Sequence, residues 1–328
     1  MGRAAAFAAP TRSMLHDVRV TTRPQPASAT DAGPALEVRR LGLVVHPRRQ
    51  IDTALDHARE WTQGHGAELV QIPVSGQERV VADPGEVASC DLVLAVGGDG
   101  TALHALHAAA AVNRPVLGVA CGSLGALTSS GAEDLVDALD RVAAGEWSPR
   151  RLPGLQVTAD GARTRTAIND VVVVRAGASQ VVVTIEVDSQ LYGRYAGDGV
   201  VVATPAGSSA YTLAAGGPVL AERSDGLVIT PLAPHGGCVP PLVVGSASAV
   251  RLQIEPGYAG SRVEFDGQVN DEQPSELCAT RVEEYATLVG LGDAEPLLAG
   301  LRRRKIIIDS PRVLARDERL AAAAAAQP

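Results

Sequence analysis

A single aspartate lies among three glycines at the end of an apolar run, in the sequence LAVGGDGTALHALHAAA from Leu94 to Ala110. The central residues are Gly97, Gly98, Asp99, Gly100 and Thr101. Where a buried strand passes into a helix, the first N–H groups of the helix are unpaired and the helix dipole favours an anion. Glycines at such a turn let a phosphate approach the backbone closely. The sequence therefore predicts a phosphate site.

The negative charge of Asp99 restricts the chemistry of this turn. The pattern is neither GxGxxG nor GxxxxGKS/T, and no lysine follows to neutralise a phosphate. An aspartate there indicates a bridging cation or a proton acceptor rather than a phosphate clamp alone. The alternative is an Asp–Gly turn in which Asp99 caps the following helix.

A second dense stretch, YAGDGVVVATPAGSSAYTLAAGGPVL, extends from Tyr195 to Leu220. A strand ends there in Pro-Ala-Gly and is followed by Ser208, Ser209, Ala210 and Tyr211. Small hydroxyl groups, glycines and one aromatic ring suit the ribose and amide groups of a nucleotide. The alternative is a plain strand-to-helix turn capped by serine.

Two histidines, His104 and His107, lie three residues apart on the expected helix after the glycine turn. A metal pair would need a third ligand and a cavity to face. We therefore expect these side chains to lie on a solvent or packing face, and we assign no metal ligands.

Short apolar runs alternate with helical patterns in the first half of the chain. The runs RLGLVVH, ELVQIPV, DLVLAVG and PVLGVACG predict strands, and helices are expected at Ile51 to Gln63, at Thr101 to about Val112, and within AEDLVDALDRVAAGEW. This alternation predicts βαβ units and a parallel sheet.

Strands dominate the second half, from Ser148 to about Leu277, where glycine and proline recur at hairpin-like intervals. The fold class is thus an α/β N-terminal domain with a parallel sheet, plus a β-rich, sandwich-like C-terminal domain. We divide the chain into a disordered leader (1–37, with Met14 as an alternative start), an α/β domain (38–148), a β-rich nucleotide-binding domain (149–283), and a C-terminal segment (284–328). That segment is expected to return to the first domain and end in a frayed tail.

Composition excludes several classes of partner. The formal net charge of -8 favours neither nucleic acid nor an anionic membrane, and no apolar run approaches the length that spans a bilayer. The four widely spaced cysteines form no CxxC pair, which indicates reduced thiols in a cytoplasmic protein.

Together, these motifs resemble the ATP- or polyphosphate-dependent NAD kinase family. GGDGT at 97–101 matches the phosphate motif of that family, AINDVVV at 167–173 its Asn-Glu element, and GDGVVVATPAGSSAYTLAAGGPV at 197–219 its long signature. LVITPLAPHGG and EFDGQ follow in family order. The resemblance covers roughly residues 41–291.

The resemblance implies a homodimer or homotetramer that transfers the γ-phosphoryl group of ATP, or a phosphoryl group of polyphosphate, to the 2′-hydroxyl of the adenosine ribose of NAD, forming NADP. It implies a divalent cation such as Mg²⁺ carried on the phosphates. Asp99 would accept or orient the hydroxyl proton, and Gly97, Gly98, Gly100 and Thr101 would lie against the donor phosphates. The implied NAD-binding residues are Asn169, Asp170, Asp198, Thr204, Ser209, Ala210, Tyr211 and His235.

Five positions depart from the family pattern. Asp170 replaces a glutamate and is one methylene shorter, while Ala120, Ala126, Ala206 and Pro240 stand where the family has asparagine, phenylalanine, threonine or serine, and arginine. The favoured interpretation of the sequence is an NAD kinase. The alternatives are a diverged paralogue that phosphorylates another adenosine- or sugar-containing acceptor, and a non-catalytic NADP(H)-binding regulator.

Overall fold

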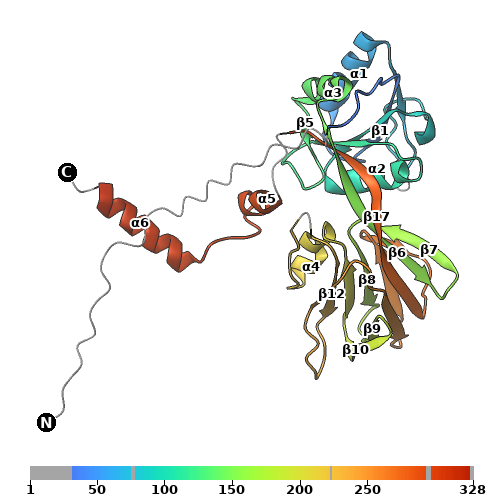
Figure 1. Cartoon of the computed structure of the whole chain (residues 1–328), viewed down its shortest axis with the longest axis vertical. Helices are drawn as coiled ribbons and strands as arrows, with labels where there is room; N and C mark the ends of the chain where they lie inside the picture. The colour runs from blue at the N-terminus through green and yellow to red at the C-terminus, as the bar shows by residue number, and fades with distance from the viewer. Residues whose placement is uncertain (1–31, 75–77, 222–223, 293–296, 326–328) are drawn as a thin grey trace.

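The computed structural model describes residues 32–74, 78–221, 224–292 and 297–325. Most of the expected leader, 1–37, lies outside the described residues. Two lobes are stacked along the long axis of the molecule, with the N-terminal lobe above the C-terminal lobe in Figure 1. Within the described residues, no helix is both long enough and apolar enough to cross a membrane.

The N-terminal lobe is a parallel sheet with helices on both faces. Its strand order is β4-β3-β1-β2, with β5 beside β4. Strands buried on both faces are continuously apolar, as parallel strands usually are. The elements are β1 (Arg40–Val45), α1 (Asp52–His65), β2 (Glu68–Gln71), η1 (Val87–Ser89), β3 (Leu92–Gly97), α2 (Asp99–Ala110), β4 (Val116–Ala120), β5 (Ser130–Gly131) and α3 (Leu135–Ala144).

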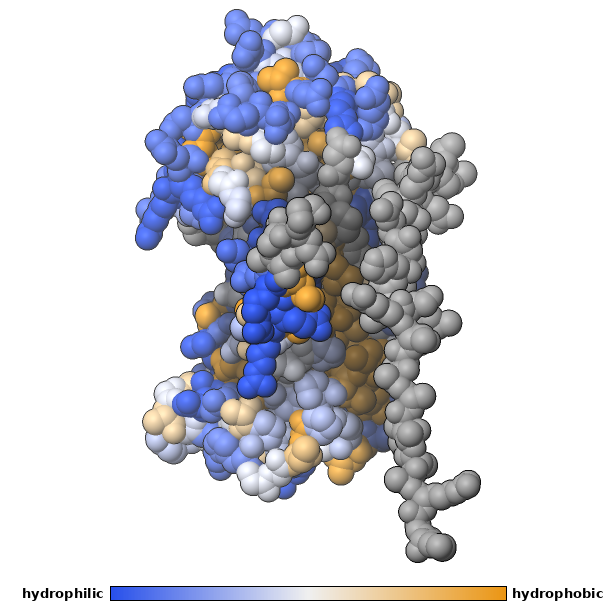
Figure 2. All heavy atoms as spheres, turned by 90° about the vertical axis from the view of Figure 1, so that its left-hand side faces the viewer, coloured by the Kyte–Doolittle hydropathy of each residue, from blue (hydrophilic) through white to orange (hydrophobic). Residues whose placement is uncertain are grey.

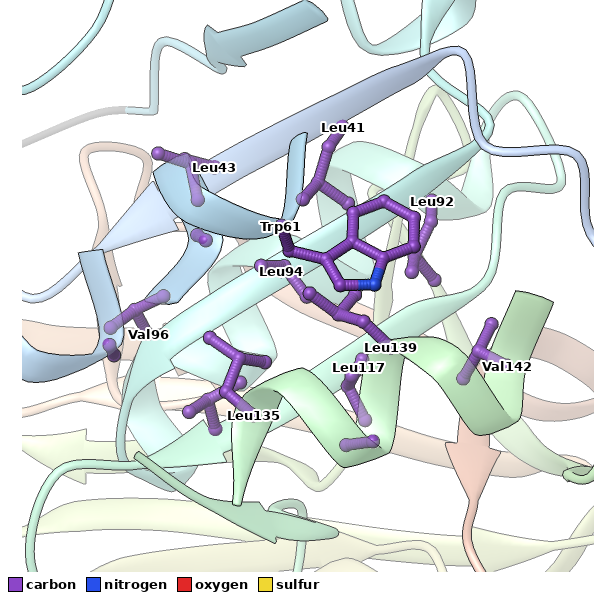
Figure 3. Close-up of a cluster of buried hydrophobic side chains, with 14 of the residues drawn as sticks. Leu41, Leu43, Trp61, Leu92, Leu94, Val96, Leu117, Leu135, Leu139 and Val142 are labelled. Carbon is purple, nitrogen blue, oxygen red and sulfur yellow. The ribbon is translucent and has the colours of Figure 1, made fainter. Parts of the chain in front are cut away.

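The two faces of this sheet have separate cores. On one face, α1 and α3 pack Trp61, Leu135 and Leu139 against the strands (Figure 3). On the other face, α2 packs Ala102 and Leu106 against the sheet and also against residues that begin the second lobe. Helix α2 is therefore positioned between the lobes.

The C-terminal lobe is a sandwich of two sheets around a valine-rich core. One sheet has the order β13-β12-β11-β8-β15-β16, and β10-β9-β14-β17 with β6 and β7 form the other layer. The elements are β6 (Ser148–Ala159), β7 (Arg163–Ala167), β8 (Asp170–Arg175), β9 (Val181–Val187), β10 (Gln190–Gly197), β11 (Gly199–Ala203), η2 (Gly207–Ser209), α4 (Tyr211–Ala214), β12 (Leu227–Leu232), β13 (Leu242–Val244), β14 (Val250–Pro256), β15 (Ser261–Phe265), β16 (Gln268–Asn270) and β17 (Glu276–Gly290). The α/β lobe and the β-rich lobe confirm the predicted fold class.

Strand β17 belongs to both lobes. It pairs with β14 and β6 in the C-terminal lobe, and its last residues pair with β4 through Leu288 and Val116. A single 11-stranded sheet consequently passes from one lobe to the other.

Several boundaries differ from those expected from sequence. Helix α2 begins two residues earlier, at Asp99, and α1 extends to His65, where Gly66 ends it in the left-handed conformation (φ 66). Pro311–Ala325 forms helix α6, which the high helix propensity of alanine favours. Helices α5 (Leu297–Arg303) and α6 project from the body in Figure 1. All four cysteines are free thiols.

The exterior of the two lobes differs in polarity on the face that Figure 2 presents. Hydrophilic side chains cover most of the upper, N-terminal lobe on this face, and hydrophobic ones gather below the waist of the molecule.

Candidate active site at the junction of the lobes

The side chain of Asp99 is held by the loop that follows β4. Its Oδ1 accepts a hydrogen bond from the backbone N–H of Leu127 at 2.9 Å, and its Oδ2 accepts one from Ala126 at 3.0 Å. Helix α2 begins at Asp99 with Gly98 as N-cap, and no side chain caps it. The alternative in which Asp99 is a helix cap is therefore wrong. Asp99 is half-buried, and two backbone donors fix its carboxylate in place.

Close packing explains two of the glycines around Asp99. A Cβ on Gly97 would overlap with the Thr101 hydroxyl, and one on Gly125 would overlap with the Asp99 carboxylate. Gly98 is extended (φ -151), so the turn needs no left-handed backbone. Gly100 is exposed with open space around it. Thr101 is buried, which leaves the backbone of Gly98 and Gly100 as the accessible part of the predicted phosphate site.

A cationic loop supplies the positive charge that the glycine motif lacks. The sequence HPRR follows β1, and the Arg49 guanidinium lies over the turn: a Cβ on Gly98 would be 3.2 Å from its Nη1. Arg79 donates through Nη1 to the Arg49 carbonyl at 2.7 Å. Among the described residues, no carboxylate is paired with the Arg49 guanidinium, so its charge is available to an anion.

His46 shapes this loop. Its Nδ1 accepts the backbone N–H groups of Arg48 and Arg49 at 3.1 and 3.0 Å, which turns the loop back toward the sheet. Burial, followed by the charges of Arg49, Arg48 and Arg79, lowers the pKa of His46. A neutral His46 retains Nδ1 as an acceptor. These arginines were not among the site residues expected from the motifs, although a basic loop after the first strand of a parallel sheet is a signal for them.

The segment Ile168–Asp170 comes against α2 from the C-terminal lobe. Ile168 belongs to the apolar cluster that includes Leu106 of α2. The Asn169 carbonyl accepts the N–H of Thr204 at 2.8 Å, and the Thr204 hydroxyl donates to the Ile168 carbonyl at 2.6 Å. Among the described residues, the Asn169 side-chain amide has no hydrogen-bond partner, so it is available to a ligand.

The serine-rich turn after β11 divides into internal and accessible residues. Thr204 and Ser208 are fully buried and hold the turn together, since Ser208 Oγ donates to the Pro205 carbonyl at 2.7 Å. Gly207 lies so close to Asn169 that a Cβ would overlap with the Asn169 carbonyl. Ser209, Ala210 and Tyr211, which begins α4, are accessible, and Tyr211 is 40% exposed. The turn is therefore built against Asn169 and presents small groups and one phenol outward.

Asp170 is buried, and its carboxyl group has an abnormal pKa. Burial, followed by the negative charges of Asp266 and Glu264, raises the pKa of Asp170 to about 7. This carboxyl therefore changes its charge near neutral pH.

Asp198 and His235 lie away from the other predicted site residues. Asp170 and Ala203 pair at one end of the β8–β11 ladder. Asp198 lies just beyond the opposite end, where it accepts a hydrogen bond from Arg175 Nε at 2.5 Å. Asp198 is five positions from Ala203 along strand β11, or about 17 Å. His235 pairs with Ala196 and lies beside Gln180, near Asp198 rather than near Asp99.

Four of the five residues that depart from the family pattern make their contacts through the backbone. Ala120 ends β4 opposite Gly97, and the N–H of Ala126 holds Asp99. The Ala206 carbonyl accepts from Ser209 Oγ, and the Pro240 carbonyl accepts from Tyr192 Oη at 2.5 Å. These contacts need no particular side chain, so the support of Asp99 persists despite the substitutions.

The pKa of Asp170 predicts how stability changes with pH. Because the folded state raises this pKa above its unfolded value, the folded protein binds the proton more tightly, and the free energy of unfolding should fall as pH rises from about 4 to about 7. Asp170→Asn should remove this decline and stabilise the protein at pH 8 by a few kcal/mol, at about 1.4 kcal/mol per pKa unit. Urea unfolding at pH 5 and pH 8 measures it. Asp137→Asn, at an exposed position on α3, is the control, and parallel pH curves for wild type and Asp170→Asn would contradict the prediction.

Two family models match this chain. Residues 36–147 match the ATP-NAD kinase N-terminal domain, and residues 168–280 match the ATP-NAD kinase C-terminal domain. The NAD kinase of Chloroflexus aggregans is 32% identical over 263 residues, which cover 77% of this chain and 95% of that protein. The NAD kinase of Chlorobaculum tepidum is 32% identical over 225 residues, or 66% and 79% of the two chains.

Solved structures share the fold. Yeast NADH kinase complexed with NADH has a TM-score of 0.69 at 19% identity, covering 83% of this chain and 89% of that one. The NAD kinase from Archaeoglobus fulgidus in complex with ATP has a TM-score of 0.63 at 24% identity, covering 80% and 98%. Both domain matches and the extent of the relatives' alignment show that this chain is an enzyme of the NAD kinase family.

Proposed function

We propose that this chain transfers the terminal phosphoryl group of ATP or polyphosphate to the 2′-hydroxyl of the adenosine ribose of NAD, giving NADP. One observation carries the proposal: the Asp99 carboxylate is fixed at the start of α2, beside an uncompensated arginine and on a helix that packs against Ile168, the residue before Asn169. Helix α2 thereby links the acid and the anion site at its start to the segment that carries the Asn169 amide, which supports the proposal. The four free thiols support a cytoplasmic location.

Phosphoryl transfer depends chiefly on alignment and on neutralisation of charge. In the proposed reaction, the ribose 2′-oxygen forms a bond to the terminal phosphorus as the bond from that phosphorus to the bridging oxygen breaks. Asp99 orients the attacking hydroxyl and accepts its proton. The unpaired N–H groups at the start of α2 and the Arg49 guanidinium hold the donor phosphates.

The divalent cation is proposed to arrive on the donor phosphates. Among the described residues, no three His, Cys, Asp or Glu side chains are grouped to hold a metal. Mg²⁺ commonly keeps several waters and binds substrate phosphates, so the donor phosphates would supply its main ligands. The bound ion would neutralise charge on the transferred group.

The acceptor nucleotide is proposed to bind along the serine-rich turn. The Asn169 amide is available for a base or ribose group, and Ser209, Ala210 and Tyr211 form an accessible wall beside it. Asp170 would act through its backbone and its buried carboxyl rather than as an exposed ligand.

We propose in addition that the working unit is a homo-oligomer. Asp198 is expected at the nicotinamide end of the nucleotide. It lies, however, beyond one end of the β8–β11 ladder, whereas Asn169 lies beyond the other end. A second copy that presents its Asp198 to the junction would complete the site.

Formation of NADP is the direct test of the proposed reaction. Purified protein with NAD, ATP or polyphosphate, and Mg²⁺ should form NADP, and Asp99→Asn should lower kcat by about 100-fold or more because the hydroxyl loses its proton acceptor. Asp91→Asn is the matched control, since Asp91 also accepts two backbone N–H groups but lies at the other end of β3. Absence of NADP with either donor would refute the proposal and favour another acceptor.

The Arg49 guanidinium is predicted to bind the phosphoryl donor. Arg49→Ala should raise KM for ATP or polyphosphate about 10- to 100-fold, because a charge-assisted hydrogen bond is lost, with a smaller change in KM for NAD. Arg49→Lys should recover part of the loss, whereas Arg194→Ala, at an exposed ion pair in the other lobe, should have no effect. An unchanged donor KM in Arg49→Ala would remove this residue from the site.

An active site that takes Asp99 from one subunit and Asp198 from another can be tested by mixing variant subunits. Asp99→Asn and Asp198→Ala proteins should each be nearly inactive, and exchange of their subunits should restore up to about a quarter of wild-type activity if each site uses both copies. Light scattering establishes the oligomer, and labelled subunits report exchange. Complete exchange without recovered activity would show that each copy uses its own Asp198.

A further inference from the structure

Helix α2 is tied to the C-terminal lobe through His107, a residue for which the reaction has no direct use. His107 lies two turns after Asp99, with its side chain 27% exposed. Its Nε2 is 2.6 Å from Oδ2 of Asp266, and its ring lies edge-on to Tyr285, whose hydroxyl is 3.3 Å from Nδ1. A carboxylate only accepts hydrogen bonds, so Nε2 carries the hydrogen.

Asp266 is presented to this junction by a tight turn. Asp266 and Gly267 connect β15 to β16, with φ values of 51 and 76, and Phe265 pairs with Gln268 across them. Two left-handed residues in a two-residue hairpin loop favour Asp-Gly, the sequence found here. The Asp266 side chain is only 1% exposed. A buried carboxylate of this kind needs several hydrogen-bond donors.

The other donors to Asp266 come from the segment that carries the nucleotide-binding residues. Its Oδ1 accepts the backbone N–H groups of Asn169 at 2.7 Å and Asp170 at 3.1 Å, and its Oδ2 accepts that of Ile168 at 2.8 Å. The Asp266 N–H in turn donates to the Asp170 carbonyl at 3.0 Å. One carboxylate therefore fixes the backbone of three successive residues.

We propose that His107 is a positioning residue, which acts through Asp266 to hold the Asn169–Asp170 segment at a fixed place relative to the helix that begins with Asp99. The proposal deepens the proposed function and rests on it. The chain of contacts is direct: Asp99 and His107 share one rigid helix, His107 binds Asp266, and Asp266 binds the backbone of the acceptor segment.

The neighbouring histidine provides a matched comparison. His104 lies one turn earlier on α2 and faces the same hairpin, with its Nε2 3.1 Å from Nε2 of Gln268. Both histidines line a hollow of about 440 Å³ between the lobes. Among the described residues, His104 makes no hydrogen bond to Asp266 or to residues 168–170, so its loss removes similar packing without releasing the acceptor segment.

Substitution of His107 should affect acceptor binding rather than donor binding. His107→Leu introduces an apolar side chain of similar size and removes the donor to Asp266, and we expect KM for NAD to rise about tenfold. KM for ATP or polyphosphate should change less than twofold, because no hydrogen bond proposed to hold the donor is lost. His107→Gln retains an N–H donor and should recover part of the NAD affinity. His104→Leu should leave KM for NAD unchanged.

A second readout does not depend on activity. Hydrogen exchange at the amides of Ile168, Asn169 and Asp170 should accelerate in His107→Leu but not in His104→Leu, because only the first variant weakens the acceptor of those amides. If the wild type forms no NADP, the proposed function fails while the exchange measurement still tests the link. Equal exchange and equal KM for NAD in the two leucine variants would overturn the inference.

Discussion

The site depends on the carboxyl ends of β1, β3 and β4 meeting at one edge of a parallel sheet. The loop after β1 provides Arg49, the turn after β3 provides Asp99, and the loop after β4 provides the two N–H groups that hold the Asp99 carboxylate. In a parallel sheet these three loops are brought together by strand order alone. Every other part of the site is arranged against this edge.

The sequence was most informative where the physical cause is local. A glycine-dense turn between an apolar strand and a helix can be recognised from about ten consecutive residues, and so can the serine-rich turn before Tyr211. The change from alternating strands and helices to successive strands correctly predicted the two lobes. These features depend on periodicity and turn chemistry within one segment.

Contacts between distant residues could not be predicted in the same way. Arg49 reaches Gly98 only because β1 is the neighbour of β3, and strand order is not written in any one segment. His107 and Asp266 are 159 positions apart. Asp198 is close to Tyr211 in sequence, yet the extended strand β11 lies between Asp198 and the serine-rich turn and keeps them at its opposite ends. Motif order along the chain thus identified the residues but not which of them meet.

Two neighbouring carboxyl groups share the centre of the junction and have different environments. Asp266 takes the available donors, His107 and three backbone N–H groups. Asp170 is left buried beside it with a raised pKa. Such an arrangement costs stability, and proteins commonly retain costs of this kind where a ligand is handled. The backbone of the acceptor segment is therefore held firmly, while burial and neighbouring negative charge disfavour the ionised form of its Asp170 carboxyl group.

The sheet shared by the lobes also limits how the molecule can move. Two long strands, β6 and β17, run side by side from one lobe into the other as a hydrogen-bonded ribbon, interrupted by an irregularity between Val282 and Ala286 where Glu284 is left-handed (φ 49). A ribbon of this kind resists the wide swing that a single flexible linker allows, and bending is concentrated at the bulge. The two lobes should therefore move little relative to each other, with bending confined to the bulge. The junction between them should be close to its final shape before a nucleotide binds.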